Sequence, residues 1–420
     1  MEFADQNSPQ DWFLRFVSVF LFRFCVSCFT TTRITIRPLR STWTKCLSGS
    51  RSVGTMAKWE INEYGDNEVL RLSETSKIPV IRDPYEVLVE VHAASMNPVD
   101  VAMRGGYGSK VINIRRKQCG SFQRGSEFPL TLGRDFSGVV IETGKKVGNF
   151  KPGDEVWGAL DLYRQGTHAE YAVTVATECA LKPKSLDHVH AASMPYVGLT
   201  AWNAIQRNGG LTREIAESKN IRALVLGGSG GVGSIAVQLL KSWGVEVTAT
   251  CSTDAVDMVK DLGADHVFDY RSQDMIVDLK GIRGSVNIKF LFVFKLVEET
   301  PSFLKDFSID VLKPWQNSVF VTTVTPLVRN FDSYGPVMGL ASSVTCTSRS
   351  FPSFICGLHN SIAQLMIVHG LRRLIAVLTF SLQIKPVVEG VFPFQHIKDA
   401  YKKLELRHLR GKTVIDVKSK

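Results

Sequence analysis

The sequence predicts an α/β protein of two domains, one rich in short strands and one with a doubly wound parallel sheet. Short apolar runs separated by turn signals extend from 56 to about 183, whereas strand and helix patterns alternate after His190. An apolar run, a glycine turn and an amphipathic segment follow one another without a gap at 223–244. At 420 residues the chain has room for both domains and a sizeable core.

Composition favours a globular enzyme and argues against several other classes. Hydrophobic residues make up 44% of the chain and charged residues 21%, which excludes a disordered polypeptide. The net charge of +10 is spread along the chain, without the aromatic-plus-basic modules of nucleic-acid binders. Cys25 and Cys28 form a C-x-x-C pair with no second pair or histidine, so the eight cysteines predict reduced thiols.

The first 55 residues are typical of a removed mitochondrial presequence. Residues 15–51 contain arginines, many serines and threonines, and no acidic residue, although Glu2, Asp5 and Asp11 precede them. The apolar stretch 12–29 is interrupted by arginines, which are costly near a bilayer centre. We predict a mitochondrial protein, with the matrix favoured over the outer membrane. A membrane anchor and a translation start at Met56 remain the alternatives.

Strand patterns dominate from 56 to 190. Val87, Val89 and Val91 alternate with other residues, as in a strand with one buried face, and the Lys-Pro-Gly-Asp sequence at 151–154 is typical of a turn. A helix end, a turn and a third strand of the parallel sheet are predicted at 263–270. Residues 385–417 return to short strands around a helix at about 397–406.

Three glycines carry the clearest functional signal. Gly228, Gly230 and Gly233 fit G-x-G-x-x-G: we expect the first to permit a tight turn, the second to admit a pyrophosphate, and the third to let helix pack on strand. The N-terminus of the following helix would face the phosphates. A glycine turn with a purely structural role is the alternative to this dinucleotide site.

The strand expected at 246–250 bears on the choice of cofactor. A site for NADH usually places Asp or Glu after this strand to accept from the ribose 2′-hydroxyl. Here Cys251 and Ser252 follow, so the sequence favours NADPH. Asp254 lies close enough to the strand end to keep NADH open.

Four stretches, at 91–100, 128–138, 150–157 and 195–202, carry a family resemblance. In them the chain resembles the zinc-free, quinone oxidoreductase-like branch of the medium-chain dehydrogenase/reductase superfamily. The resemblance implies a GroES-like substrate domain at 56–190 and a Rossmann NADPH-binding domain at 191–384. Residues 385–420 would return to the GroES-like domain.

The resemblance also implies site residues. Those expected near the nicotinamide and substrate are Asn97, Asp100 and Thr200. Those expected to line the cofactor, with the three glycines above, are Ser229, Gly231, Val232, Ser252, Tyr270 and Arg410. Ser252 and Arg410 suit a 2′-phosphate, because a hydroxyl and a guanidinium both donate to phosphate oxygens. Asn97 and Asp100 are also residues that commonly cap turns, and this structural reading stays open.

No metal site is predicted. Zinc relatives need a cysteine and a His-Glu pair, because catalytic zinc takes about three protein ligands. This chain has Asn97, then Gly133, Arg134 and Asp135, and neither Asn nor Arg replaces a thiolate or an imidazole. Cys119 stands alone where relatives carry a structural zinc lobe.

Two segments depart from the family. Lys-Leu-Val-Glu-Glu at 295–299 replaces an Asp-x-x-Gly-Gly turn, and side chains there are expected to obstruct the cofactor. Residues 341–381 form a Ser-, Cys- and Leu-rich stretch unlike the relatives.

Two function hypotheses follow. The first is an NADPH-dependent reductase of a quinone or activated carbonyl, by resemblance in mitochondrial quinone metabolism such as ubiquinone biosynthesis. The second is a catalytically weak NADPH-binding interaction protein. The resemblance further implies a protein partner of the reticulon type and a homodimer.

Overall fold

The computed structural model describes residues 54–118, 126–271, 290–293, 319–322, 384–406 and 409–419. The chain divides into two units, Met1–Ser52 and Val53–Lys420, and the described residues all belong to the second. Residues 1–53 of the predicted presequence therefore lie outside the described residues. Among the described helices, none has the length and apolar character that a bilayer crossing needs.

The β-rich part is organised around a seven-stranded sheet in the order β13-β14-β3-β4-β5-β7, with β6 also paired to β3. Its strands are β3 (Glu86–Ser95), β4 (Asp135–Thr143), β5 (Glu155–Ala159), β6 (Tyr171–Val175), β7 (Cys179–Leu181), β13 (Val388–Pro393) and β14 (Lys412–Asp416). Val87, Val89 and Val91 are buried in β3, as their alternation predicts. A two-stranded sheet of β1 (Thr55–Glu60) and β2 (Arg71–Lys77) is separate.

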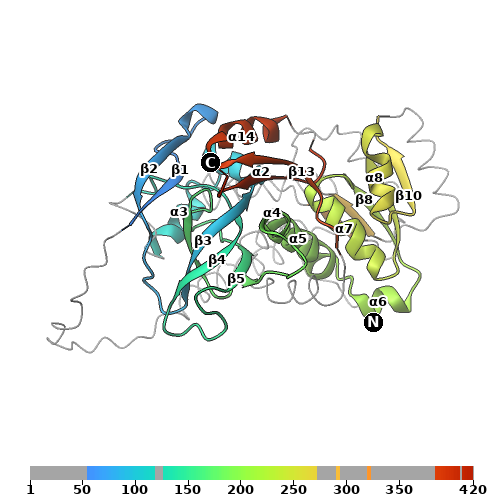
Figure 1. The fold of residues 1–420 in the computed structure, drawn as a ribbon. Coiled ribbons are helices and arrows are strands. Elements are labelled where there is room, and N and C mark those ends of the chain that lie inside the picture. Colours follow the sequence, from blue (N-terminus) through green and yellow to red (C-terminus); the bar gives the residue numbers. More distant parts are fainter. Residues whose placement is uncertain are drawn as a thin grey trace, which may run out of the picture. The chain divides into compact units, whose positions relative to one another are not determined.

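The C-terminal strands lie far in sequence from their neighbours. β14 pairs antiparallel with β3, with Val414 opposite Ser95, and parallel with β13. Figure 1 shows these red strands beside the blue β3, with α14 (Ile397–Glu405) next to them. The residues after 384 thus complete a sheet that the first half of the chain begins.

The second sheet is parallel and five-stranded, in the order β10-β9-β8-β11-β12. Its strands are β8 (Arg222–Leu226), β9 (Glu246–Cys251), β10 (His266–Asp269), β11 (Phe290–Val293) and β12 (Val319–Thr322). The chain order runs outward from β8 on one side and resumes with β11 on the other. Ligands bind at such a reversal, outside the carboxyl ends of the strands.

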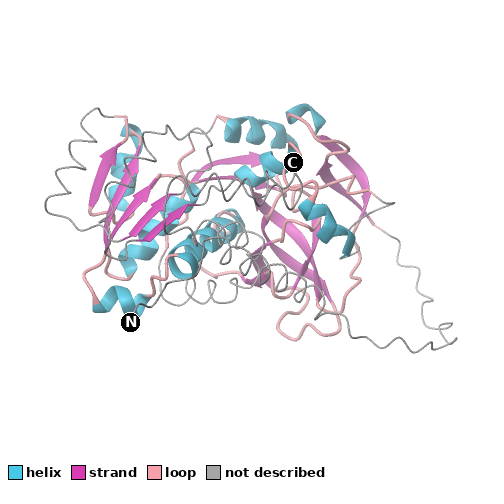
Figure 2. Ribbon diagram, turned by 180° about the vertical axis from the view of Figure 1, so that it is seen from behind, coloured by secondary structure: helices cyan, strands magenta, loops and turns pink. Residues whose placement is uncertain are grey.

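Helices cover and join the two sheets (Figure 2). They are α2 (Pro98–Arg104), α3 (Val111–Gln118), α4 (His188–Ala192), α5 (Pro195–Trp202), the π-helix η2 (Asn203–Asn208), α6 (Arg213–Ser218), α7 (Gly231–Ser242) and α8 (Val256–Asp261). Short 3-10 turns are η1 (Asn67–Val69), η3 (Thr253–Ala255) and η5 (Phe394–His396). Figure 1 places α4 and α5 between the two sheets.

The core supports the predicted strand-turn-helix unit. Leu224 and Val225 of β8 are buried, and so are Ala236, Leu239 and Leu240 on one face of α7. This is the 3.6-residue stripe expected of a helix packed on a sheet. Trp157 and Ala159 of β5 belong to the same core, so α5 packs against both parts of the molecule. The predicted domain boundaries at 55, 190 and 384 remain predictions.

Candidate functional site

The glycine turn connects β8 to α7 and is fixed on β9. The backbone N–H groups of Gly227 and Gly228 donate to the Thr250 carbonyl at 3.2 and 2.8 Å. Gly227 has a φ of +81°, so the residue before the first motif glycine is the left-handed residue of the turn. A Cβ on Gly228 would lie 3.0 Å from the Cβ of Ala249. Close approach to β9 therefore restricts Gly228.

The other two motif glycines behave differently from each other. A Cβ on Gly233 would lie 2.0 Å from the Gly227 carbonyl oxygen, because α7 packs directly on the turn. A Cβ on Gly230 would meet only that same oxygen, at an ordinary 3.5 Å. Gly233 is thus required for packing within the protein, whereas the space beside Gly230 is open for a ligand.

The N-terminus of α7 offers unpaired donors at this open space. Gly230 is the N-cap residue and has no capping side chain. The first bond along the helix runs from Ser234 N–H to the Gly230 carbonyl at 2.9 Å, so the N–H groups of Gly231, Val232 and Gly233 have no acceptor within the helix. These donors and the helix dipole favour an anion.

The start of β14 lies against the glycine turn. Gly411 N–H donates to the Ser229 carbonyl at 2.8 Å, and Gly411 also forms a bridge with Gly230. Gly411 separates Arg410, which contacts Asp254, from Lys412, which reaches Asn97. Arg410 is one of the predicted cofactor residues, whereas Lys412 was not predicted from the sequence. Its signal was a lysine at the start of an apolar strand pattern.

The predicted 2′-phosphate residues meet at the carboxyl end of β9. Ser252 follows β9. The Arg410 guanidinium bonds the carboxylate of Asp254, and the Ser252 hydroxyl lies close enough to that carboxylate to lower its pKa. The Ser252 hydroxyl, and after it the Arg410 guanidinium, lowers the pKa of Asp254 to about 2. Tyr270 lies beside them, with its N–H on the Cys251 carbonyl at 3.0 Å. The structure thus places Arg410 in contact with Asp254, close to Ser252, and places the Tyr270 backbone beside the end of β9.

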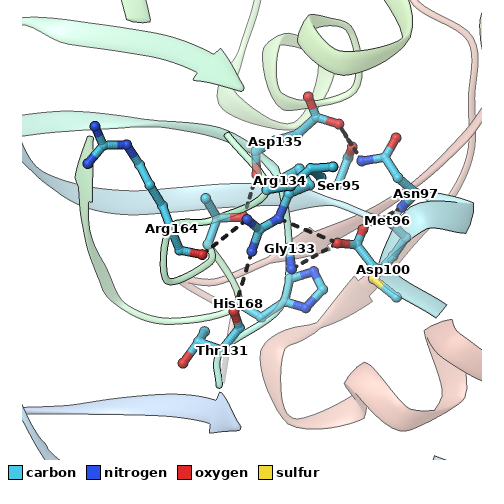
Figure 3. A network of polar contacts seen from close by, with 12 residues as sticks. Ser95, Met96, Asn97, Asp100, Thr131, Gly133, Arg134, Asp135, Arg164 and His168 are labelled. Atoms are coloured by element: carbon cyan, nitrogen blue, oxygen red, sulfur yellow. Dashed lines mark hydrogen bonds and ion pairs between the residues drawn. The ribbon is translucent and has the colours of Figure 1, made fainter. Parts of the chain in front are cut away.

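A buried network centred on Asp135 lies on the other side of Gly411. One oxygen of Asp135 accepts from Ser95 at 2.6 Å and from Asn97 at 2.8 Å, and lies 3.4 Å from the Lys412 ammonium (Figure 3 shows the first two bonds). The second oxygen accepts from the Tyr196 N–H at 2.6 Å. All these groups are buried, so Asp135 joins β3, β4, β14 and α5 by their polar atoms.

Lys412 and Asp135 together fix the orientation of the Asn97 amide. Asn97 Oδ1 accepts from Lys412 Nζ at 2.6 Å, while Nδ2 donates to Asp135. A flipped amide would set its NH₂ against an ammonium and its oxygen against a carboxylate. One Nδ2 hydrogen remains free of these partners. Lys412 Nζ also donates to the Met96 carbonyl at 2.7 Å.

Asp100 connects two backbone segments by hydrogen bonds. Its oxygens accept from the N–H groups of Asn97 at 2.8 Å and Gly133 at 3.0 Å. Burial raises its pKa to about 6, against the opposing effect of the Arg134 guanidinium, whose Nε lies 3.9 Å away. In Figure 3 the same guanidinium donates to the carbonyls of Thr131 and Arg164. This geometry matches the capping role that the sequence left open.

Thr200 lies on α5, one turn after Tyr196. Its hydroxyl donates to the Tyr196 carbonyl at 2.8 Å, and its side chain is half-buried. Because Asp135 holds the Tyr196 N–H, the start of α5 is attached to the Asp135 network, and Thr200 is positioned through it.

His168 is a buried neighbour of this network. Its Nδ1 lies 3.4 Å from the Tyr401 hydroxyl, and its Nε2 has no hydrogen-bond partner. Burial, and then the charge of Arg134, lowers its pKa to about 3. The ring is therefore neutral at physiological pH.

In the residues that the structure describes, no three His, Cys, Asp or Glu side chains converge as metal ligands. The oxygens of Asn97, Asp135 and Met96 surround the Lys412 ammonium instead. Residues 295–299 and 341–381 lie outside the described residues, so the predicted obstruction of the cofactor remains a prediction.

The ion pair between Lys412 and Asp135 predicts a specific stability change. Lys412→Met should lower the free energy of unfolding by about 3–5 kcal/mol, because it leaves Asp135 buried without its counter-charge. Urea unfolding followed by circular dichroism measures the loss. Adding Asp135→Asn should recover part of it. A double variant no more stable than the single one would contradict this account.

The neutral His168 predicts a pH effect. Its pKa in the folded state, about 3, is below the 6.5 of a free histidine, so unfolding takes up a proton between these values. The contribution of neutral His168 to the free energy of unfolding is fully present above pH 6.5 and is lost as the pH falls toward 3. His168→Gln should reduce the acid loss of stability by up to about 1.4 kcal/mol per pH unit. Urea unfolding at a series of pH values measures this dependence. If the free energy of unfolding falls with pH in parallel for variant and wild type, His168 is not the titrating group.

Two family models match the chain. The model for the alcohol dehydrogenase GroES-like domain matches residues 83–184, and the model for the zinc-binding dehydrogenase matches residues 231–319. Among solved structures, Escherichia coli quinone oxidoreductase complexed with NADPH superimposes with a TM-score of 0.61 over 86% of this chain and 99% of that one, at 21% identity. This likeness supports the fold alone, and it agrees with the GroES-like and Rossmann prediction.

Closer relatives establish the family. The mouse protein named "NAD(P)H oxidoreductase RTN4IP1, mitochondrial" is 44% identical over 86% of this chain and 89% of its own length. The Caenorhabditis elegans protein named "Reticulon-4-interacting protein 1, mitochondrial" is 37% identical over 87% and 96%. The predicted resemblance is confirmed: the chain belongs to this family of NAD(P)H oxidoreductases within the medium-chain dehydrogenase/reductase superfamily.

Proposed function

We propose that this protein is a zinc-independent, NADPH-dependent reductase that transfers hydride to a quinone or an activated carbonyl or enone. The observation that carries the proposal is the open space at Gly230, which faces the free N–H groups of α7 at the carboxyl edge of the parallel sheet. Ser252 and Arg410 supply donors for a 2′-phosphate nearby. The residues present therefore fit NADPH.

The dinucleotide, when bound, supplies the hydride. The turn at 227–230 and the first turn of α7 would hold its pyrophosphate, and Ser252, Tyr270 and Arg410 its adenosine end. The protein's task is then to set the distance and orientation between nicotinamide and substrate.

Asn97 is suited to orient a carbonyl oxygen. Its free Nδ2 hydrogen can donate to that oxygen, and Lys412 on the amide oxygen strengthens the donor by withdrawing electron density. Negative charge that develops on the oxygen during hydride transfer would thereby be stabilised.

Thr200 and Asp100 take different parts in this arrangement. The Thr200 oxygen retains acceptor capacity, which suits an amide N–H of the nicotinamide. Both oxygens of Asp100 are engaged by backbone N–H groups, so we assign it a positioning role. Both oxygens of Asp100 and both oxygens of Asp135 already accept hydrogen bonds, so we assign to water the proton that completes the reduction.

A second candidate function is a cofactor-binding interaction protein. Two observations favour it: the sequence at 295–299 lacks the family's glycine turn, and the worm relative is named for interaction with reticulon-4. A reticulon-type partner and a homodimer belong to this proposal. The relatives named mitochondrial agree with the composition of the leader, and the protein is assigned to mitochondria. The matrix and ubiquinone biosynthesis are proposed as its setting.

A turnover assay separates the two functions. NADPH oxidation with short-chain quinones and enones should proceed with the wild-type protein and slow with Asn97→Ala. Thermal-shift titration shows binding independently, since a ligand at about 100 times its Kd adds about 2.7 kcal/mol of stability. Binding without turnover would support the interaction protein, and absence of both would reject both functions.

Gly230→Asp should reduce NADPH affinity at least tenfold, about 1.4 kcal/mol. The new carboxylate would occupy the space expected for the pyrophosphate and repel it, whereas the fold should persist because a Cβ fits there. Titration calorimetry measures the affinity.

Gly148→Asp is the matched control, because Gly148 is exposed and a Cβ there meets nothing within 4 Å. It adds the same charge in the other sheet's loops and should leave affinity unchanged. Undiminished binding by Gly230→Asp would show that the cofactor does not lie at this turn.

A further inference from the structure

Asp254 holds two of the groups that a 2′-phosphate would need. Its carboxylate is paired with the Arg410 guanidinium, and the Ser252 hydroxyl lies close enough to lower the pKa of the same carboxylate. The Asp254 and Arg410 side chains are about half exposed, at 51% and 41%. An exposed pair of this kind can exchange partners readily, because water competes with both charges.

We infer that Asp254 is a specificity-determining residue that competes with the 2′-phosphate of NADPH for Arg410 and Ser252, and thereby keeps NADH in use. This inference rests on the proposed function, since it concerns the adenosine end of the same dinucleotide site. The inference gives a role to the Asp254 carboxylate, which belongs neither to the glycine motif nor to the residues expected to bind the 2′-phosphate.

The backbone explains why the competition is local. Gly411 N–H is bonded to Ser229 at 2.8 Å, so the residue next to Arg410 is fixed on the glycine turn. Ser252 is likewise fixed, as the N-cap of η3 immediately after β9. Only the side chains can adjust, and a 2′-phosphate must take donors that Asp254 now occupies.

The local charge balance adds a repulsive component. Asp269, at the end of β10, interacts with Asp254 as a like charge, and both raise the pKa of the buried Cys251 thiol, after burial itself, to about 11. A phosphate would bring more negative charge to this pair of carboxylates. The ribose 2′-hydroxyl of NADH would instead find in Asp254 an acceptor, as in NAD-preferring sites.

The test compares Asp254→Asn with wild type for NADPH and NADH by titration calorimetry on the full chain. NADPH should bind about twofold to fivefold more tightly to the variant, the size expected for removing one exposed like charge. NADH affinity should stay equal or fall. The gain should shrink near 1 M salt, where the Debye length is about 3 Å.

Asp257→Asn is the matched control. Asp257 is exposed in the first turn of α8, three positions further along, so the variant loses the same charge without touching Arg410. It should leave the ratio of the two affinities unchanged. An equal change of this ratio in both variants would show that only the net charge of the protein matters, and it would overturn the inference.

Arg410→Met tests whether Asp254 acts through Arg410. In that background Asp254→Asn should alter NADPH affinity by less than half of its single effect. The minimal probes adenosine 2′,5′-bisphosphate and AMP should show the same pattern without the nicotinamide. Looser or unchanged NADPH binding by Asp254→Asn would overturn the inference while leaving the proposed function intact. Failure of the wild-type protein to bind any of the four ligands would overturn the function itself.

Discussion

The buried ion pair between Lys412 and Asp135 is the constraint on which the site depends. A lysine ammonium and a carboxylate are costly to remove from water, and the cost is offset only if each finds further partners. Here the Asp135 carboxylate accepts hydrogen bonds from Ser95, Asn97 and the Tyr196 N–H. The Lys412 ammonium donates to the Met96 carbonyl and to the Asn97 amide oxygen. The pair and its partners come from β3, β4, β14, α5 and the segment that follows β3, so the ends of four elements must meet at one point.

The same strand that brings Lys412 to Asp135 also brings the two halves of the site together. Gly411 bonds the glycine turn, and a Cβ on Gly231 would lie 2.9 Å from Cδ of Lys412. The stem of Lys412 therefore runs from the first turn of α7 to the amide of Asn97. A displacement of β14 would alter both the expected phosphate-binding turn and Asn97, the residue proposed to orient the substrate, because both contact this strand.

Local patterns made much of this fold predictable, and non-local contacts did not. The strand, turn and helix at 223–244 follow from apolar periodicity and glycine spacing within one continuous segment, and Asp100 follows from its position after Asn97. The left-handed Gly227 was missed because the motif fixes spacing and not φ. Lys412 was missed because its partner Asn97 is 315 positions away, and no local pattern shows which buried carboxylate a lysine will meet.

Arg410 and Lys412 show how one short segment can serve two physical requirements. Lys412 is buried. Burial lowers its pKa, and the charge of Asp135 opposes this effect. Its ammonium must keep its partners, because losing them would leave a buried charge unpaired at a large cost in free energy. Arg410 is exposed, and its ion pair with Asp254 is weakly held because water screens both charges. A change at the exposed Arg410 is therefore expected to leave Asn97 in place. The proposed roles of these two ends, in cofactor preference and in substrate geometry, would be separable because the intervening Gly411 anchors the backbone between them.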